Sequence, residues 1–316
     1  MNRPSHLPDV DAVIVNRDGG ESVFAAIRSL QQQEEVNLSL VVVDNDSSAS
    51  ERERLSAEKG VRVVGFSRNL GFAGAANEGI ARTRAPFVLL VNNDATLAPD
   101  YAARLAARLA LDERLAAAQG LVRTADGSRV DTAGIAWTDR GEAVPVLSGA
   151  SAAAAPSEAF EVAGVSATAA LYRREALSAV APQGQVFDDT FFAYYEDADL
   201  SLRLARAGWR FACDPSAVAR HEGGRTGSRT PFRRAIWTAR NRWRTLFRNF
   251  EPRRIRASFG RLLRADLAHA RALGWKGAAL PLLVWPQLPL EALRFRREPR
   301  RLPDWPEAAA ADGRHP

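Results

Sequence analysis

The first hundred residues alternate short apolar runs with segments of helical periodicity. The apolar runs are residues 13–15, 38–43, 61–64 and 88–91. Each run is wholly or mostly apolar, with Ser39 and Arg62 as the polar exceptions, which is typical of strands buried on both faces of a sheet. After the first run, an apolar helical stripe comprises Val23, Phe24, Ile27 and Leu30, with Ser22 as the expected helix cap. Four such pairs predict an α/β fold with a doubly wound, mostly parallel sheet covered by helices on both faces.

The fourth apolar run leads directly into Asn92, Asn93 and Asp94. Ligands of open α/β sheets bind at the carboxyl ends of the strands, so the Asp94 carboxylate is expected to face a crevice. A buried carboxylate needs a partner, and a divalent cation that itself binds a phosphate meets that need. Alternatively, Asp94 caps the following helix, which Pro99 and Asp100 open. The residue alone leaves both interpretations open.

A glycine-rich segment, residues 69–79, follows the third apolar run. It places Gly71 and Gly74 where a loop turns into a helix, which permits close backbone approach to a phosphate or a ribose. The segment matches neither the Walker loop nor the Gly-x-Gly-x-x-Gly dinucleotide motif, which argues against an ATPase and against a dehydrogenase. A glycine-rich turn that is needed only for packing is the alternative interpretation.

A second group of polar residues lies in residues 187–200, where acids occur among aromatic side chains. The acids are Asp188, Asp189, Glu196, Asp197 and Asp199. A helix with Leu200 and Leu204 on its apolar face follows, and Asp197 or Asp199 is expected to cap it. Capping accounts for one acid only, because adjacent like charges repel unless they share a cation or a proton. The cluster therefore indicates a function.

The chain between and after these two centres is less informative. Residues 110–156 have no clear periodicity, with one strand of a hairpin expected at 132–137. A short strand at 210–213 and a turn at 214–215 precede His221. A lone histidine is more often structural than a ligand, so the residue by itself predicts no metal site.

Length and composition suit one large domain with an appendage, since 46% of the 316 residues are hydrophobic. We expect a catalytic domain over residues 9–230, a basic helical extension over 231–302 and a disordered tail over 303–316. The single cysteine, Cys213, excludes an intramolecular disulfide and fits a reducing compartment, and residues 1–11 lack the apolar core of a signal peptide. The expected location is therefore cytoplasmic.

The net charge of +6 is unevenly distributed. Residues 225–302 hold 20 basic and 4 acidic residues, a net charge of +16, and the remainder carries −10. A helical stripe from Phe232 to Phe250 is expected to pack on the catalytic domain. Further on, Trp275 and Trp285 flank a proline-broken apolar segment that suits an anionic membrane surface better than a span. We expect peripheral binding to the inner face of the plasma membrane, and no nucleic acid partner.

With these segments in view, the chain resembles the family 2 glycosyltransferases, in particular the bacterial branch that contains rhamnosyltransferases. The matching segments are residues 13–16, 42–45, 69–79, 90–94 and 192–200, with Arg203, Gly208 and His221. They occur in the family's order and extend over residues 10–250. The resemblance implies a GT-A-like nucleotide-diphospho-sugar transferase fold. Arg17 and Asp18 depart from the usual tyrosine and asparagine, which leaves the contacts of the first loop open.

The resemblance also implies roles for particular residues. Asp94 and His221 are implied as ligands of a divalent ion, Mg²⁺ or Mn²⁺, that binds the diphosphate of the donor. Asp197 is implied as the catalytic base, with Glu196 beside it. The residues implied on the donor side are Asn16, Asp44, Asn45, Asn69, Gly71, Asn77 and Asn93, and those on the acceptor side are Asp199 and Arg203.

The implied reaction moves a sugar, rhamnose being the commonest in this branch, from a nucleotide-diphosphate donor to a hydroxyl of a glycan or lipid-linked acceptor. Its oxocarbenium-like transition state needs a cation at the departing diphosphate and one base on the opposite face, which predicts inversion. A nucleotidyltransferase of similar fold and a catalytically silent membrane-associated scaffold remain the alternatives. The transfer requires that Asp94 and Asp197 face a single cavity.

Overall fold

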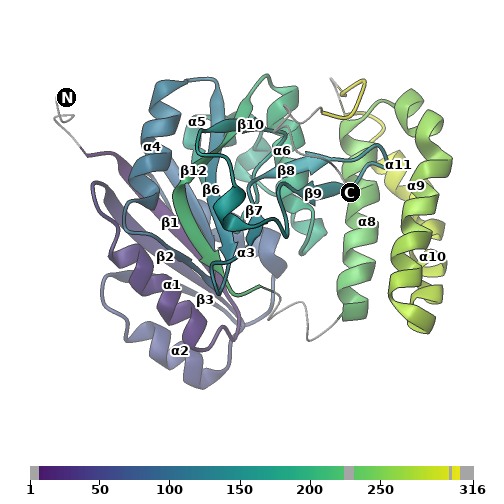
Figure 1. The fold of residues 1–316 in the computed structure, drawn as a ribbon. Coiled ribbons are helices and arrows are strands. Elements are labelled where there is room, and N and C mark those ends of the chain that lie inside the picture. The colour runs from purple at the N-terminus through teal and green to yellow at the C-terminus, as the bar shows by residue number, and fades with distance from the viewer. Residues whose placement is uncertain (1–6, 224–230, 299–300, 307–316) are drawn as a thin grey trace.

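The computed structural model describes residues 7–223, 231–298 and 301–306. The first four strands are β1 (Asp9–Asn16), β2 (Asn37–Asn45), β3 (Val61–Phe66) and β4 (Phe87–Asn92). They are mutually parallel, in the spatial order β3-β2-β1-β4, as the alternating apolar runs predicted. The connecting helices are α1 (Glu21–Gln31), α2 (Ala49–Ser56) and α3 (Gly71–Ile80), and α4 (Tyr101–Leu111) follows β4. This half of the sheet brings the carboxyl ends of β1, β2 and β4 to one edge (Figure 1).

The second half of the sheet is mixed rather than parallel. Its strands are β5 (Ala95–Leu97), β6 (Leu115–Thr124), β7 (Val130–Thr132), β10 (Phe160–Val162), β11 (Ala169–Arg173) and β12 (Arg210–His221). Strands β8 (Ile135–Trp137) and β9 (Ala143–Pro145) lie outside this sheet and form a separate hairpin. Strand β11 runs antiparallel between β4 and β6, and β12 pairs parallel with β6. The described strands thus form one ten-stranded mixed sheet, ordered β10-β12-β6-β11-β4-β1-β2-β3 along its main path.

Two of these strands differ from the sequence prediction. Strand β6 lies in the region expected to lack periodicity, because its alanine-rich sequence carries no strand signal although its first eight residues are buried. Strand β12 does not end at the expected turn after Cys213. It continues to His221 through an irregularity between Asp214 and Val218, and so carries the histidine along the sheet.

Helices cover both faces of the sheet. On one face, α1, α2 and α4 pack against side chains such as Ile14 and Val42, and on the other α3, α5 (Arg174–Ala179) and α6 (Glu196–Arg206) pack against Val13 and Val43. The four predicted stripe residues of α1 are all buried. Ser22 is not the cap, because it lies inside α1, where its hydroxyl donates to Glu222 at 2.7 Å; Gly20 occupies the cap position.

The C-terminal extension is helical, as expected. It consists of α8 (Pro231–Asn249), α9 (Pro252–Ala272), α10 (Ala279–Val284) and α11 (Leu288–Arg294), with short 3₁₀ helices at Gly274–Ala278 and Trp285–Gln287. The other described 3₁₀ helices lie before the extension, at Ala152–Ala154, Pro182–Gly184 and Asp189–Phe191. Figure 1 shows these helices stacked against the side of the sheet domain that carries α6. A third core cluster joins Trp243 and Phe250 of the extension to Trp137 and Leu202. The extension therefore packs on the catalytic domain.

Part of the segment expected to be disordered, residues 303–316, is packed against the protein. Trp305 is buried, with its ring 4.3 Å from that of Phe250 and beneath the guanidinium of Arg254. Residues 303–306 are therefore packed chain, and the rest of the expected tail, residues 307–316, lies outside the described residues.

Candidate active site

The structure brings Asp94 and His221 together at the edge of the sheet. Short strand β5 pairs with the end of β12, so that His221 lies opposite Ala95. The imidazole Nε2 is 3.0 Å from Asp94 Oδ1, and Nδ1 is 2.9 Å from Asp131 Oδ2. Burial by itself lowers the pKa of His221, but the hydrogen bonds to both carboxylates raise it to about 9. Asp94 does not cap α4, which begins at Tyr101 after Asp100.

The donor set at this edge fits a divalent ion that is shared with a substrate. Asp94 offers carboxylate oxygen, the donor that Mg²⁺ and Mn²⁺ both accept, and His221 offers Nε2, whose orientation is fixed by Asp131 on the other ring nitrogen. No group of three or more His, Cys, Asp or Glu residues in the described chain is arranged to hold a metal ion alone. A metal ion at this edge would therefore need further ligands from outside these side chains.

Glu196 and Asp197 occupy the first turn of α6. Neither Asp197 nor Asp199 is the N-cap, a position taken by Tyr195, so the capping prediction is wrong. The Asp197 carboxylate accepts hydrogen bonds from the backbone N–H of Ala167 at 3.2 Å and of Ala198 at 2.8 Å. Glu196 is buried, and its Oε2 has no hydrogen-bond partner in the described part of the chain.

The two carboxylates are electrostatically unlike. Burial, followed by the charge of Asp197, raises the pKa of Glu196 well above its ordinary value. Burial also raises the pKa of Asp197, but the N–H groups of Ala167 and Ala198 act in the opposite direction by stabilising its ionised form. The N–H groups that favour the ionised form are thus found at Asp197, the residue that the sequence implies as the base.

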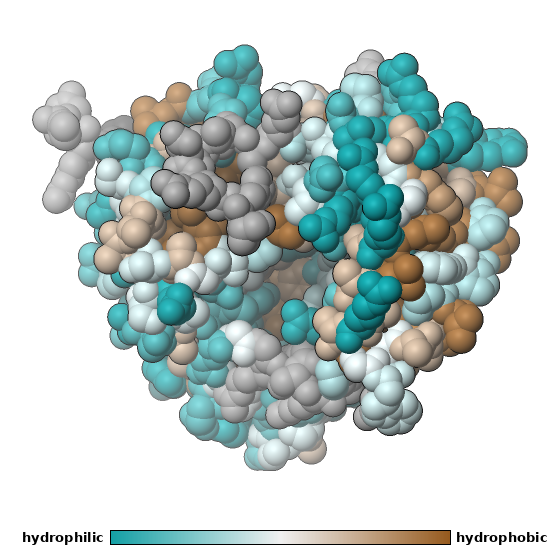
Figure 2. All heavy atoms as spheres, turned by 45° about the vertical axis from the view of Figure 1, so that its right-hand side comes forward, coloured by the Kyte–Doolittle hydropathy of each residue, from teal (hydrophilic) through white to brown (hydrophobic). Residues whose placement is uncertain are grey.

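A single turn, residues 166–168, joins the Asp94 end of β4 to Asp197. Thr168 accepts a hydrogen bond from the backbone N–H of Asn92 at 2.9 Å, and Ala167 donates to Asp197 at 3.2 Å. Figure 2 shows the face of the molecule toward the C-terminal helices as hollowed, with hydrophobic residues at the floor and hydrophilic ones along one rim. The segments that bear the two acids therefore flank the same short turn.

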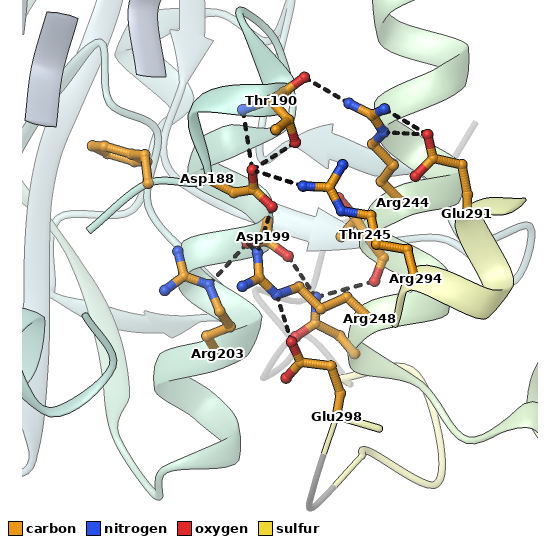
Figure 3. Close-up of polar contacts among 12 residues, drawn as sticks. Asp188, Thr190, Asp199, Arg203, Arg244, Thr245, Arg248, Glu291, Arg294 and Glu298 are labelled. Atoms are coloured by element: carbon orange, nitrogen blue, oxygen red, sulfur yellow. Dashed lines mark hydrogen bonds and ion pairs between the residues drawn. The ribbon is translucent and has the colours of Figure 1, made fainter. Parts of the chain in front are cut away.

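Asp199 and Arg203, which were expected on the acceptor side, are engaged with other side chains of the protein. Both are buried, and Arg203 Nε donates to Asp199 Oδ2 at 2.8 Å. Asp199 also accepts hydrogen bonds from two α8 side chains, from Arg248 Nη1 at 3.2 Å and from Asn249 Nδ2 at 2.8 Å (Figure 3). The repulsion inferred among the acids is thereby resolved in part, because Asp199 has its own cations and faces the extension.

The polar residues at the ends of β1 and β2 are engaged with the chain. Asn16 is fully buried and accepts a hydrogen bond from Asn93 Nδ2 at 2.8 Å. It also donates to Glu51 at 2.6 Å, and Glu51 accepts the N–H groups of residues 19 and 20 ahead of α1. Asp44, also fully buried, pairs with Arg52 Nε at 2.9 Å. Glu51 therefore provides the anion at the start of α1.

The remaining residues of the expected donor set hold loops in place. Asn45 accepts the N–H of Leu70 at 2.8 Å, and Asn69 accepts that of Gly71 at 2.8 Å. Asn77 forms two hydrogen bonds with the backbone of Phe187, at 2.8 and 2.9 Å. Gly71 has a φ of +74°, and a Cβ there would collide with the carbonyl of Phe192. Its close backbone approach is thus to Phe192, and donor contacts by these residues stay predictions.

Comparison with known proteins decides the family. The model of the family described as Glycosyl transferase family 2 matches residues 12–180, just over half of the chain. The chain belongs to glycosyl transferase family 2. The family expected from the short motifs is therefore confirmed, and the matched range contains both Asp94 and Asp131.

Relatives of this family 2 glycosyltransferase extend the comparison. The succinoglycan biosynthesis protein ExoO of Rhizobium meliloti (strain 1021) is 32% identical over 112 residues, which is 34% of this chain and 32% of that protein. GalNAc-T7, crystallised with UDP, GalNAc and Mn²⁺, superposes with a TM-score of 0.62 at 16% identity over 79% of this chain and 49% of its own. The mannosyltransferase PcManGT from Pyrobaculum calidifontis, in complex with GDP-Man and Mn²⁺, gives 0.57 at 18% identity over 92% and 79%. The GT-A-like fold is confirmed.

Three residues of this glycosyltransferase site were missed by sequence reasoning. Asp131 orients His221 from a region without periodicity, and Glu51 holds the first loop from a charged helix. Asn241 contacts the loop before Glu196 from α8, the helix whose apolar stripe predicted packing alone. A signal existed for Glu51 alone, since the unusual Arg17 and Asp18 marked the loop that it holds.

Proposed function

We propose that this family 2 glycosyltransferase moves a sugar from a nucleotide-diphosphate donor to an acceptor hydroxyl with inversion. The observation that carries the proposal is the turn at residues 166–168, which lies between the strand end leading to Asp94 and the carboxylate of Asp197. In this proposal, a diphosphate bound at Asp94 and a hydroxyl bound at Asp197 approach one sugar from opposite sides. A single base opposite the leaving group gives inversion without a covalent intermediate.

Asp94 and His221 would hold a divalent ion, Mg²⁺ or Mn²⁺, with His221 bound through Nε2 after loss of its proton, and Asp131 keeps the ring oriented from Nδ1. When bound, the ion supplies positive charge that neutralises the departing diphosphate. Asp197 accepts the proton of the acceptor hydroxyl, for which the two oxygens must come within about 3 Å. Burial raises the pKa of Glu196, which opposes a second negative charge beside the base.

The substrates are proposed by class. A nucleotide sugar as donor is supported by the UDP and GDP-Man in the similar structures, and rhamnose remains the proposal from the resembling bacterial branch. A glycan or lipid-linked acceptor is supported by the relative that acts in succinoglycan biosynthesis. Acceptor recognition by Asp199 or Arg203 is no longer part of the proposal, because both are buried and paired.

Two measurements test this function. A thermal-shift panel of nucleotide sugars with Mn²⁺ or Mg²⁺ is expected to identify a donor that raises Tm only with metal. Turnover of that donor is expected to release free nucleoside diphosphate and to invert the anomeric centre. Release of pyrophosphate would favour a nucleotidyltransferase, and the absence of any nucleotide-sugar binding would favour a catalytically silent scaffold.

We further propose that α10 and α11 bind an anionic membrane surface. Exposed apolar side chains are Trp275, Leu282, Leu290 and Leu293, with exposed fractions of 84%, 76%, 71% and 58%. Exposed arginines of the extension include 253, 256, 261, 264, 271, 296 and 297. Apolar insertion beside arginine suits an anionic lipid interface. In the described chain, no helix is both long and apolar enough to cross a bilayer.

Vesicle sedimentation tests the membrane proposal. We expect the protein to pellet with phosphatidylglycerol vesicles but not with phosphatidylcholine vesicles, and to be released by salt. Leu282→Glu and Leu290→Glu are expected to weaken pelleting. The matched control is Leu111→Glu, at a leucine of α4 that is 78% exposed on the catalytic domain. Equal pelleting by all three variants would contradict the proposal.

A further inference from the structure

The loop that precedes Glu196 has an unusual backbone. Phe192, Tyr194 and Tyr195 have φ values of +66°, +71° and +70°, in the left-handed region that residues other than glycine rarely adopt. Such conformations persist only where the surrounding structure enforces them, and they gather at functional sites. Since this loop ends at the first turn of α6, the path of its backbone determines the positions of Glu196 and Asp197.

One side chain of α8 holds this loop. Asn241 is fully buried, and its Nδ2 group donates to the backbone carbonyls of Phe191 at 2.8 Å, Ala193 at 2.9 Å and Tyr194 at 2.8 Å. The three carbonyls that lie just before and within the left-handed stretch thus accept from one amide group. An Asn is suited to this contact because its two N–H groups fork from one planar nitrogen.

Arginines on the same face of α8 support the contact. Arg240, Arg244 and Arg248 recur at intervals of four residues and therefore share one side of the helix. Arg240 donates to the carbonyl of Phe191 at 3.2 Å, and Arg244 donates to that of Thr190 at 2.6 Å. Figure 3 shows Arg244 held in turn by Glu291 of α11, and Arg248 reaching Asp188 and Asp199.

We propose that Asn241 is a positioning residue for the transfer reaction, acting through the loop of residues 191–195 on the placement of Asp197. The inference rests on the proposed function and deepens it, because it makes the C-terminal extension a working part of the catalytic site. Asn241 itself touches neither substrate nor Asp197. Its removal allows the left-handed residues to relax, which displaces the start of α6 and the base with it.

The test compares Asn241→Asp with Thr245→Val. Aspartate keeps the size of the side chain but turns carboxylate oxygens toward the three carbonyls. Thr245 is an equally buried α8 residue whose hydroxyl has no hydrogen-bond partner among the described residues, so valine there is a matched control. We expect N241D to lower kcat by about 100-fold, the effect of a misplacement of roughly 1 Å, with donor Kd within about twofold of wild type. T245V is expected to have the kcat and the donor Kd of the wild type.

A readout without substrate separates this inference from the proposed function. Amide hydrogen exchange in residues 188–195 is expected to rise in N241D and to stay unchanged in T245V. If N241D does not fold, Asn241→Ser, which keeps one donor, is expected to show a smaller change in the same direction. Unchanged kcat and exchange in the folded variant would overturn the proposal. Failure of the wild-type protein to turn over any nucleotide sugar would instead refute the proposed function, while the exchange result would still test the role of Asn241 in ordering the loop.

Discussion

His221 Nε2 lies 3.0 Å from Asp94 Oδ1, and the pairing of β5 with the end of β12 creates this contact between distant parts of the chain. Strand β12 must continue past its irregularity at Asp214 for the histidine to arrive there. The pair that we propose as metal ligands is therefore brought together by strand pairing in the mixed half of the sheet. Asp131 then fixes the ring from the other side, at 2.9 Å.

Replacement of Asp131 is expected to weaken metal binding. The Asp131→Asn variant no longer accepts strongly from Nδ1, so the imidazole loses its fixed orientation and part of its basicity. We expect the affinity for Mn²⁺ in the presence of donor to fall by about 10- to 100-fold. Titration of Mn²⁺ by electron paramagnetic resonance measures this, with Asp139→Asn, at a 67% exposed site, as the control. Equal affinities in the two variants would contradict the role of Asp131.

Glu196 predicts a pH-dependent loss of stability. Burial, followed by the charge of Asp197, raises its pKa well above normal, so the folded state binds this proton more tightly than the unfolded chain does. The resulting stabilisation is complete below the unfolded pKa, about 4.3, and is lost as the pH rises through the raised folded value. Relative to Glu196→Gln, whose amide does not titrate, the wild-type Tm should therefore decline toward neutral and alkaline pH. Parallel Tm curves for the two proteins would show that the carboxyl is not buried in this way.

Gly71 is expected to tolerate no side chain. Gly71→Ala imposes a left-handed conformation on alanine and also drives its Cβ into the carbonyl of Phe192, in the loop before the catalytic pair. Gly149→Ala, at a φ of +78° with open space around the glycine, isolates the conformational cost of about 1 to 2 kcal/mol. We expect G71A to be destabilised by more than G149A and to lose transfer activity, as measured by urea unfolding and turnover. Equal free energies of unfolding for G71A and G149A would mean that the Phe192 carbonyl moves aside without destabilising the fold.

Asp266 tests whether the extension folds as part of the domain. It is buried and accepts hydrogen bonds from Arg242 at 2.8 Å, Trp243 at 2.8 Å and Trp285 at 2.9 Å. Asp266→Ala leaves the Arg242 guanidinium buried and without its charge partner, which is expected to cost about 3 to 5 kcal/mol in urea unfolding.

The control for this ion pair is Asp304→Ala. Asp304 is 69% exposed and pairs with Arg254 at 2.8 Å, so its loss is expected to cost less than about 1 kcal/mol. Similar costs for the two variants, or an extension that unfolds separately in D266A with the catalytic domain unaffected, would argue that the helices are an independent appendage.

The parallel half of the fold was predictable because β1, β2 and β4 are largely buried and their sequences contain nearly continuous apolar runs. Strand β6 was not, since an alanine-rich run such as residues 115–118 is as compatible with a helix or a loop as with a strand. The sequence does contain the information that Asp197 and Asp199 point in different directions from α6. Two helical steps turn a side chain by about 200°, which directs them to opposite faces.

Contacts between distant segments were beyond the sequence. The i,i+4 spacing of Asp199 and Arg203 is typical of an internal ion pair, but the approach of Arg248 and Asn249 depends on how α8 packs. Likewise, the sequence pattern predicts that asparagines such as Asn45 and Asn77 contact a ligand. In the structure, the side-chain amides of both residues form hydrogen bonds with loop backbone. Polar residues with local backbone partners cannot be told from ligand-binding ones by type and spacing alone.

The most direct test of the two-sided site compares Asp94→Asn with Asp197→Asn. With the donor that the thermal-shift panel identifies, donor binding is measured by calorimetry with Mn²⁺, and transfer is measured in a single turnover. We predict that D197N binds donor like the wild type but transfers about 10²- to 10⁴-fold more slowly, and that D94N loses metal-dependent donor binding. Near-normal transfer by D197N, or donor binding by D94N that still responds fully to Mn²⁺, would contradict the account.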